Sequence, residues 1–123
     1  MEAKKILIIE DEKFIGELYK RALLQAGYMV TVAESGDKGL EEALTGNFDI
    51  ILLDIMVPGI LGVDILKKIK YEHPEIKSKI IIATNLEHDE ETRKSIEKDA
   101  DGYLIKAEIT PVELAGFIDQ IEI

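Results

Sequence analysis

The stretch that decides the fold is Asp49-Ile50-Ile51-Leu52-Leu53-Asp54-Ile55-Met56-Val57-Pro58-Gly59. Its aliphatic run is short and is closed by a Pro-Gly turn, a pattern typical of a strand buried on both faces of a parallel sheet. Asp54 follows that run directly, at the end where open α/β sheets place their ligand sites. We therefore expect a buried strand over 49–53 with a functional carboxylate at its carboxyl end.

A second aliphatic run also ends in acidic residues. Strand-like residues 5–9 are followed by Glu10, Asp11 and Glu12. Because parallel strands end at the same edge of a sheet, Glu10 and Asp11 are expected close to Asp54. Carboxylates gathered in this way cannot all ionise comfortably without a cation. Glu12 is better explained as the acidic first turn of the next helix.

Strand-like and helix-like patterns alternate from end to end, as in stacked βαβ units. The expected strands are 5–9, 29–32, 49–53, 79–84 and 102–105. The expected helices are 13–26, 36–44, one that includes 63–69 and stops before Pro74, 89–98, and one that starts at 111. Joined by right-handed crossovers, these units predict an α/β fold with a doubly wound parallel sheet and helices on both faces.

Capping residues support these limits. Gly27 stands just past the first helix, where a left-handed residue commonly ends a helix. Ser35 is an expected N-cap of the second helix. Thr110, Pro111 and Glu113 form the start signal of the last helix, with a hydroxyl at N-cap, proline at N1 and an acid at N3.

Two helices differ in how they are expected to pack. In the first, Phe14, Ile15 and Leu18 recur at helical spacing and are expected mainly in the core. In the helix over 89–98 only Ile96 is strongly apolar, so that helix is expected to be exposed, thinly packed and comparatively mobile.

The composition describes one domain of ordinary size. The chain has 123 residues, 46% hydrophobic and 33% charged, with a formal net charge of −10 at pH 7. That charge argues against nucleic-acid binding, which needs clustered Lys and Arg, and against adhesion to anionic membranes. There is no cysteine, no secretory signal pattern and no apolar run near the roughly 20 residues of a membrane helix. We therefore expect a single domain over 1–123, without an output domain, in the cytoplasm.

Polar groups follow four of the expected strands. They are the acids at 10–12, Asp54, Thr84 after the fourth strand, and Lys106 after the fifth. Several carboxylates, a hydroxyl and an ammonium without a histidine suit a hard cation that prefers oxygen ligands. Mg²⁺ fits best, because it keeps water ligands and pairs with phosphate oxygens.

This ordered set resembles the receiver domain family of two-component response regulators, and the likeness spans essentially the whole chain. In that family an acidic pair, a phosphoacceptor Asp, a Thr or Ser and a Lys occupy these strand ends. The matching positions here are Glu10, Asp11, Asp54, Met56, Pro58, Gly59, Gly62, Thr84, Tyr103 and Lys106. The resemblance implies a flavodoxin-like fold with the strand order 2-1-3-4-5.

The resemblance implies a phosphorylation site. Asp54 would be the nucleophile that accepts a phosphoryl group from a sensor histidine kinase or phosphotransfer protein. Asp11, Asp54 and the backbone carbonyl of Met56 would bind Mg²⁺, with Glu10 acting through water. Lys106 would place a compact positive charge beside the phosphate. The domain would be a signalling protein rather than an enzyme, promoting only its own phosphorylation and dephosphorylation.

The resemblance also implies a switch. Thr84 would donate its hydroxyl to a phosphate oxygen, and Tyr103 would turn inward into the space that Thr84 vacates. The surface made by the fourth helix, fifth strand and fifth helix would present the change to a downstream protein whose identity the sequence does not give. Part of the first helix would help to dock the kinase.

Three positions depart from the family pattern. Glu10 stands where Asp is commoner, and its longer side chain should still reach a metal-bound water. Asn85 replaces the usual Ala beside the phosphate entrance. Ala107 replaces a Pro that usually follows a cis peptide bond, so we expect a trans Lys106–Ala107 bond or a strained cis one.

Other functions remain open at this point. A degenerate receiver could act as a protein-binding module that does not switch. A magnesium-dependent hydrolase with an aspartyl nucleophile would commonly carry a second Asp where this chain has Met56. Flavin binding is disfavoured, because the loop after the first strand is acidic and lacks residues that cradle phosphate.

Overall fold

The computed structural model describes residues 3–55, 57–85 and 90–121, with only the backbone described at residue 92. Five parallel strands form one sheet in the order β2-β1-β3-β4-β5, which confirms the expected topology. They are β1 Lys5–Ile9, β2 Met29–Ala33, β3 Ile50–Asp54, β4 Lys79–Thr84 and β5 Gly102–Ile105.

Helices connect the strands in the expected alternation. They are α1 Lys13–Gln25, α2 Gly36–Ala43, α3 Gly62–Lys67, α4 Glu90–Asp99 and α5 Pro111–Asp119. Two short helical turns, η1 Lys68–Glu72 and η2 Lys106–Glu108, follow α3 and β5. The turn η1 is π-helical, so the third helix ends in a widened turn before Pro74. The predicted start of the fourth helix at Asp89 lies outside the described residues.

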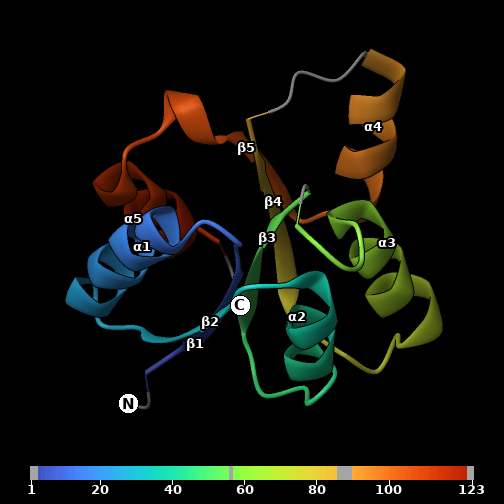
Figure 1. Cartoon of the computed structure of the whole chain (residues 1–123), viewed down its shortest axis with the longest axis horizontal. Coiled ribbons are helices and arrows are strands. Elements are labelled where there is room, and N and C mark those ends of the chain that lie inside the picture. Colours follow the sequence, from blue (N-terminus) through green and yellow to red (C-terminus); the bar gives the residue numbers. More distant parts are fainter. Residues whose placement is uncertain (1–2, 56, 86–89, 122–123) are drawn as a thin grey trace.

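The sheet is covered on both faces (Figure 1). Helices α1 and α5 lie on one face, and α2, α3 and α4 lie on the other. Successive residues of β1 show why, because Ile6 and Ile8 pack toward one layer while Leu7 and Ile9 pack toward the other. All five residues of β3 are buried, as expected for the central strand of a sheet covered on both faces.

The register aligns the strand ends that carry the candidate residues. Ile9 pairs with Leu53, Asp54 with Ala83, and Thr84 with Ile105. The strand β3 includes Asp54 itself, one residue beyond the predicted end. The residues that follow β1, β3, β4 and β5 therefore emerge along one edge of the sheet.

The predicted helix caps are confirmed. The Ser35 Oγ accepts a hydrogen bond from the Lys38 N–H, 3.2 Å away. The Thr110 Oγ1 accepts from the Glu113 N–H, and the Glu113 carboxylate accepts from the Thr110 N–H, which completes a capping box. Gly27 has a φ of +99°, the left-handed conformation that ends α1.

The core face predicted for α1 is partly wrong. Phe14 is 76% exposed and Leu18 is 36% exposed, while Gly16, Tyr19 and Leu23 are the buried positions. The helix is rotated so that the small Gly16 lies over Val32, where an added Cβ would be 3.4 Å from the valine side chain. This close approach turns the Phe14 side of α1 toward solvent.

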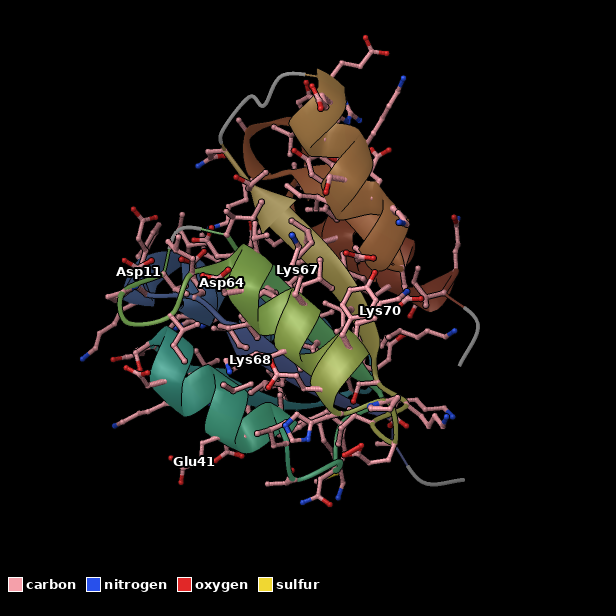
Figure 2. All side chains as sticks on the ribbon, turned by 90° about the vertical axis from the view of Figure 1, so that its right-hand side faces the viewer. Asp11, Glu41, Asp64, Lys67, Lys68 and Lys70 are labelled. Atoms are coloured by element: carbon pink, nitrogen blue, oxygen red, sulfur yellow. The ribbon has the colours of Figure 1, made fainter. Side chains whose placement is uncertain are left out.

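Helix α4 forms the outer edge of its layer (Figure 1). Among its described side chains only Ile96 and Asp99 are buried, which confirms the expected exposure. Figure 2 shows the outer surface of this layer, where Glu41, Asp64 and Lys67 lie on α2 and α3. Within the described part of the chain, no helix is both long and apolar enough to cross a bilayer.

Candidate metal centre

Two neighbouring strands deliver the acidic residues. Glu10 and Asp11 follow β1, and Asp54 is the last residue of β3. The Glu10 N–H donates to the Ala33 carbonyl at 3.0 Å, so the backbone stays hydrogen-bonded to β2 for one residue past the end of β1. The Glu12 N–H donates to the Glu10 carboxylate, which ties the start of α1 to the same point. The parallel pairing of Ile9 with Leu53 holds the ends of β1 and β3 side by side.

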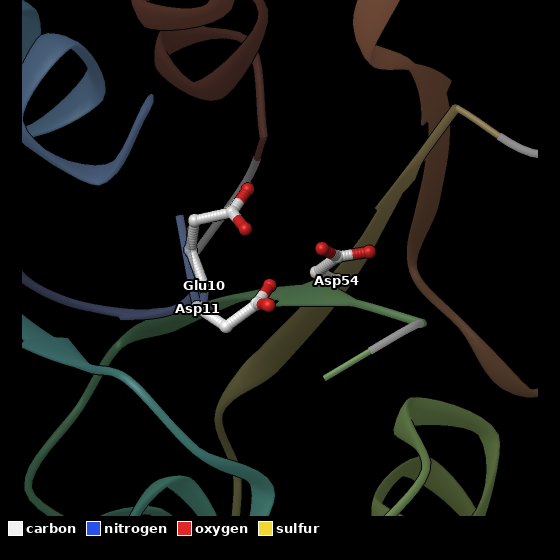
Figure 3. A group of neighbouring side chains, drawn as sticks. All are labelled: Glu10, Asp11 and Asp54. Atoms are coloured by element: carbon white, nitrogen blue, oxygen red, sulfur yellow. The ribbon is translucent and has the colours of Figure 1, made fainter. Parts of the chain in front are cut away.

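Glu10, Asp11 and Asp54 face a common space (Figure 3). One carboxylate oxygen of each lies within 4.8 Å of the others. Glu10 is 2% exposed and Asp54 is 9% exposed, while Asp11 faces solvent. Carboxylate oxygens are the ligands that Mg²⁺ prefers, and an open side leaves room for the waters that it keeps. The donor set therefore fits Mg²⁺.

Lys106 brings a positive charge to the same group from the end of β5. Its Nζ donates to the Asp54 Oδ2 at 2.9 Å and also forms an ion pair with Glu10. The lysine side chain is 7% exposed, so both ion pairs are shielded from water. Among the described residues no peptide bond is cis, and the Lys106–Ala107 bond is trans. The trans alternative of the sequence prediction is the one observed.

Burial controls the protonation of this group. Burial raises the pKa of Glu10 to about 7, the nearby Asp54 charge adds to the rise, and Lys106 only partly opposes it. Burial alone would lower the pKa of Lys106, but its hydrogen bonds to Glu10 and Asp54 outweigh burial and raise it. Lys106 therefore stays charged near neutral pH, where Glu10 takes up a proton.

The loop between β3 and α3 packs directly on the backbone of Asp54. The Gly62 N–H donates to the Ile55 carbonyl at 2.9 Å, and a Cβ on Gly62 would lie 2.5 Å from the Asp54 carbonyl oxygen. Gly59 has a φ of +92°, which permits the turn after Pro58. Met56, whose carbonyl was predicted as a metal ligand, lies outside the described residues.

The predicted switch residues lie farther along the sheet. Thr84 is fully buried at the end of β4, one residue past Ala83, the partner of Asp54. Asn85, which follows, is exposed. Tyr103 is half-buried on β5, and the Arg93 guanidinium lies 5.0 Å from the centre of its ring. The structure thus places a cation from α4 over the aromatic side chain, which the sequence did not reveal.

Tyr19 is a further residue near the site that sequence reasoning missed. It is buried on α1, and burial raises the pKa of its hydroxyl. The charges of Lys106, Glu10 and Asp54 all act on that pKa, so Tyr19 lies within electrostatic reach of the cluster. In the sequence, the helical spacing of Tyr19 from Gly16 and Leu23 was the signal that could have placed it on the buried face of α1.

Comparison with known proteins gives a consistent result. The family model described as response regulator receiver domain matches residues 6–118. The transcriptional regulatory protein CusR of Escherichia coli K12 is 39% identical over 102 residues, covering 83% of this chain and 44% of that protein. DltR of Streptococcus agalactiae is 36% identical over 102 residues, covering 83% of this chain and 45% of its own length. The chain spans less than half the length of these relatives.

Solved structures match the whole fold. A CheY-like response regulator receiver domain from Methanospirillum hungatei has a TM-score of 0.84 at 29% identity, covering 97% of this chain and 93% of that one. The BeF3-activated receiver domain of DrrB has a TM-score of 0.81 at 28% identity, covering 97% of both chains.

Proposed function

Because this chain belongs to the response regulator receiver domain family, we propose that it is a phosphorylation-controlled signalling domain whose phosphoacceptor is Asp54. The phosphoryl donor would be a sensor histidine kinase or a phosphotransfer protein. Receiver domains bind Mg²⁺ at acidic residues, and the acidic cluster of this chain supports the same use.

One observation carries the proposal. Glu10, Asp11 and Asp54 converge within 4.8 Å, and the Lys106 ammonium contacts two of them. A carboxylate acts as a nucleophile toward phosphorus when its surroundings neutralise the charge that two anions bring together. The cluster offers that neutralisation from two directions, a cation site on the Asp11 side and the Lys106 ammonium on the other.

Phosphorylation would exchange one bond for another at phosphorus. An oxygen of Asp54 attacks the phosphorus atom, the bond to the donor nitrogen or oxygen breaks, and an acyl phosphate forms. Asp11, Asp54 and the Met56 carbonyl, with Glu10 acting through water, would hold Mg²⁺, whose charge would offset that of the phosphoryl oxygens. The Asp54 side chain is 11% exposed, which leaves it reachable from the open side of the cluster.

Lys106 would keep its place and change its partners. Its ammonium has three donors, and two of them already point to Glu10 and Asp54. A phosphoryl group on Asp54 adds oxygens beside the same nitrogen, so Lys106 can bind phosphate without a large movement. The ion pairs of the unphosphorylated domain therefore already hold the Lys106 ammonium where it would bind the phosphoryl group.

The signal would leave through Thr84 and Tyr103. A phosphoryl group adds roughly one to two negative charges and strong hydrogen-bond acceptors at the end of β3. Thr84 is on the neighbouring strand, and Tyr103 packs one strand farther along, against the layer that contains Ile96 of α4. We propose that the α4–β5–α5 surface then changes its affinity for a downstream protein, and a change of about 5–150-fold is typical of such coupling.

The test is phosphorylation by a small donor. The protein is incubated with acetyl phosphate and Mg²⁺, and the intact protein is weighed. We expect one base-labile phosphoryl adduct in the wild type, none with a chelator present, and none in Asp54→Asn. An adduct of equal yield in Asp54→Asn, or no adduct in the wild type, would contradict the proposal that Asp54 is the phosphoacceptor.

Switching is tested separately with beryllofluoride, which mimics the phosphoryl group. Amide resonances of Thr84, Tyr103 and α4 should shift in the wild type when beryllofluoride and Mg²⁺ are added together. Shifts confined to residues around Asp54 would instead favour a binding module that does not switch.

A further inference from the structure

The first residue of α2 touches the loop that leaves Asp54. The Gly36 N–H donates to the Pro58 carbonyl at 2.8 Å. A Cβ added to Gly36 would lie 2.2 Å from the Ile60 carbonyl oxygen and 2.7 Å from the Ile60 nitrogen. Contacts this short with backbone atoms cannot be relieved by a side-chain rotation, so the loop or the helix would have to shift.

The backbone conformation of Gly36 does not itself require glycine. The described glycines with positive φ are Gly27, Gly46 and Gly59, and Gly36 is not among them. At a helical position alanine is normally the better residue. The close approach to Ile60 is therefore the reason for glycine at this place.

The loop is held on its other side by the phosphoacceptor strand. Gly62 packs on the Asp54 carbonyl, where an added Cβ would lie only 2.5 Å from the oxygen. Residues 57–61 thus run between the first turn of α2 and the backbone of Asp54. Figure 2 shows this loop lying beside the start of α2. Neither contact has spare room, so a displacement at Gly36 would be passed on toward Asp54.

We infer that Gly36 is a positioning residue that holds the loop after β3 in the place required for divalent-cation binding at the acidic cluster. The inference rests on the proposed function and adds a role for the amino end of α2. Gly36 lies outside the carboxylate cluster, and it sets the position of the backbone that follows Asp54. Direct partners of metal ligands commonly change metal affinity by about 10–100-fold when altered, and Gly36, which acts through the loop, should have an effect at the low end of that range.

The principal variant is Gly36→Ala, tested by titration of Mg²⁺ into the isotope-labelled full chain. The dissociation constant is read from the amide shifts of Asp11 and Asp54. We expect it to rise at least about tenfold, the low end for such supporting contacts. In acetyl phosphate assays the Mg²⁺ concentration for half-maximal rate should rise by the same factor, with a smaller change in the rate at saturating Mg²⁺.

Gly116→Ala is the matched control. Gly116 is also a glycine inside a helix, and a Cβ there would have no heavy atom within 4 Å. This variant should keep the wild-type Mg²⁺ dissociation constant and should have an equal or higher melting temperature. Thermal melts of both variants separate a loss of metal affinity from a loss of folding.

Ser35→Ala tests the same contact without adding an atom. It removes the N-cap bond to the Lys38 N–H, which loosens the turn that presents the Gly36 N–H to Pro58. We expect a smaller rise in the Mg²⁺ dissociation constant, about two- to fivefold, together with faster hydrogen exchange at Gly36.

The outcomes are distinguishable. An unchanged dissociation constant in folded Gly36→Ala, or in Ser35→Ala if Gly36→Ala does not fold, would overturn the role of Gly36. Failure of the wild type itself to bind Mg²⁺ would overturn the proposed function instead.

Discussion

Lys106 supplies the positive charge that makes the buried acids tolerable. Glu10 and Asp54 are both mostly removed from water, and the Lys106 Nζ lies 2.9 Å from Asp54 and is paired with Glu10. Burying carboxylates together without a cation favours the uptake of a proton. Burial raises the pKa of Glu10 to about 7, so the positive charge of Lys106 only partly offsets the effect of burial on this carboxylate.

Replacing Lys106 should therefore destabilise the metal-free protein. Removing one partner of a buried ion pair typically costs about 3–5 kcal/mol, and protonation of Glu10 would reduce that cost. We expect Lys106→Met to lose about 2–4 kcal/mol in urea unfolding with a chelator present. Adding Mg²⁺ should restore more stability to this variant than to the wild type.

Lys94→Met provides the control for that measurement. Lys94 forms an ion pair with Glu90 at 3.3 Å, but both side chains are largely exposed. Such pairs are worth about 0–1 kcal/mol, so this variant should unfold almost as the wild type does. Equal losses of unfolding free energy in the two variants would show that the buried Lys106 ion pairs stabilise the fold no more than an exposed ion pair does.

Tyr28 gives the fold a dependence on alkaline pH. Burial, then its hydrogen bond to Asp119, raises the pKa of Tyr28 to about 12. Because the folded-state pKa lies above the unfolded value, the contribution of Tyr28 to stability is complete below about pH 10 and is lost as the pH rises through about 12. The unfolding midpoints of wild type and Tyr28→Phe should therefore converge over that range. A constant difference between them would contradict the raised pKa.

Among the elements, α5 depends most clearly on its first turn. The capping box of Thr110 and Glu113 satisfies two backbone N–H groups at the start of this helix, which packs beside α1. Thr110→Ala should lower the free energy of unfolding by about 1 kcal/mol, as for other lost N-caps. Denaturant titration measures this value.

The nearby Val112→Ala serves as the reference for α5. Val112 is 76% exposed, and its replacement should change stability by less than about 0.5 kcal/mol. If Thr110→Ala proved as mild as Val112→Ala, the capping box would contribute nothing measurable.

The sequence predicts which elements form better than it predicts how each one packs. The run from Ile50 to Leu53 is short, wholly apolar and bounded by turn signals, and this combination favours a buried strand over a helix. In α1 two apolar rows compete, and the buried row is decided by how closely Gly16 approaches Val32. The π-helical turn at the end of α3 likewise depends on packing against other elements, so local patterns do not predict it.

The candidate site likewise has a part that the sequence predicts and a part that it does not. The ends of parallel strands place Glu10, Asp11, Asp54 and Lys106 at one edge, so residue type and strand position were enough to predict their proximity. The role of Gly36 needs the distance between a helix and a loop that are separate in the sequence. That contact becomes visible only once the chain is folded.

At the scale of the whole molecule, the charge of −10 makes cations stabilising in general. Stabilisation by specific Mg²⁺ binding must therefore be distinguished from the general screening of negative charge by added salt. At a Mg²⁺ concentration of about 100 times the dissociation constant, binding to the folded state alone adds about 2.7 kcal/mol. Thermal unfolding should show this gain for Mg²⁺ but not for KCl of equal ionic strength. Asp11→Asn should lose most of the difference, and an undiminished gain in that variant would argue for binding elsewhere.

The site is one edge of a sheet, and the proposed readout surface is another part of the same rigid sheet. Strands β3, β4 and β5 are adjacent, so Asp54, Thr84 and Tyr103 lie on successive strands. The proposed switch would carry a change of charge at Asp54 across these adjacent strands to Tyr103.

Reductive trapping of the phosphorylated residue tests the central claim most directly. The protein is treated with acetyl phosphate and Mg²⁺, reduced with borohydride, digested and sequenced by mass spectrometry, since borohydride converts an aspartyl phosphate to homoserine. We predict homoserine at position 54, only when both phosphodonor and Mg²⁺ are present. Homoserine at another acidic residue, or at position 54 in equal yield without Mg²⁺, would contradict a site in which clustered acids bind a cation so that Asp54 can accept phosphate.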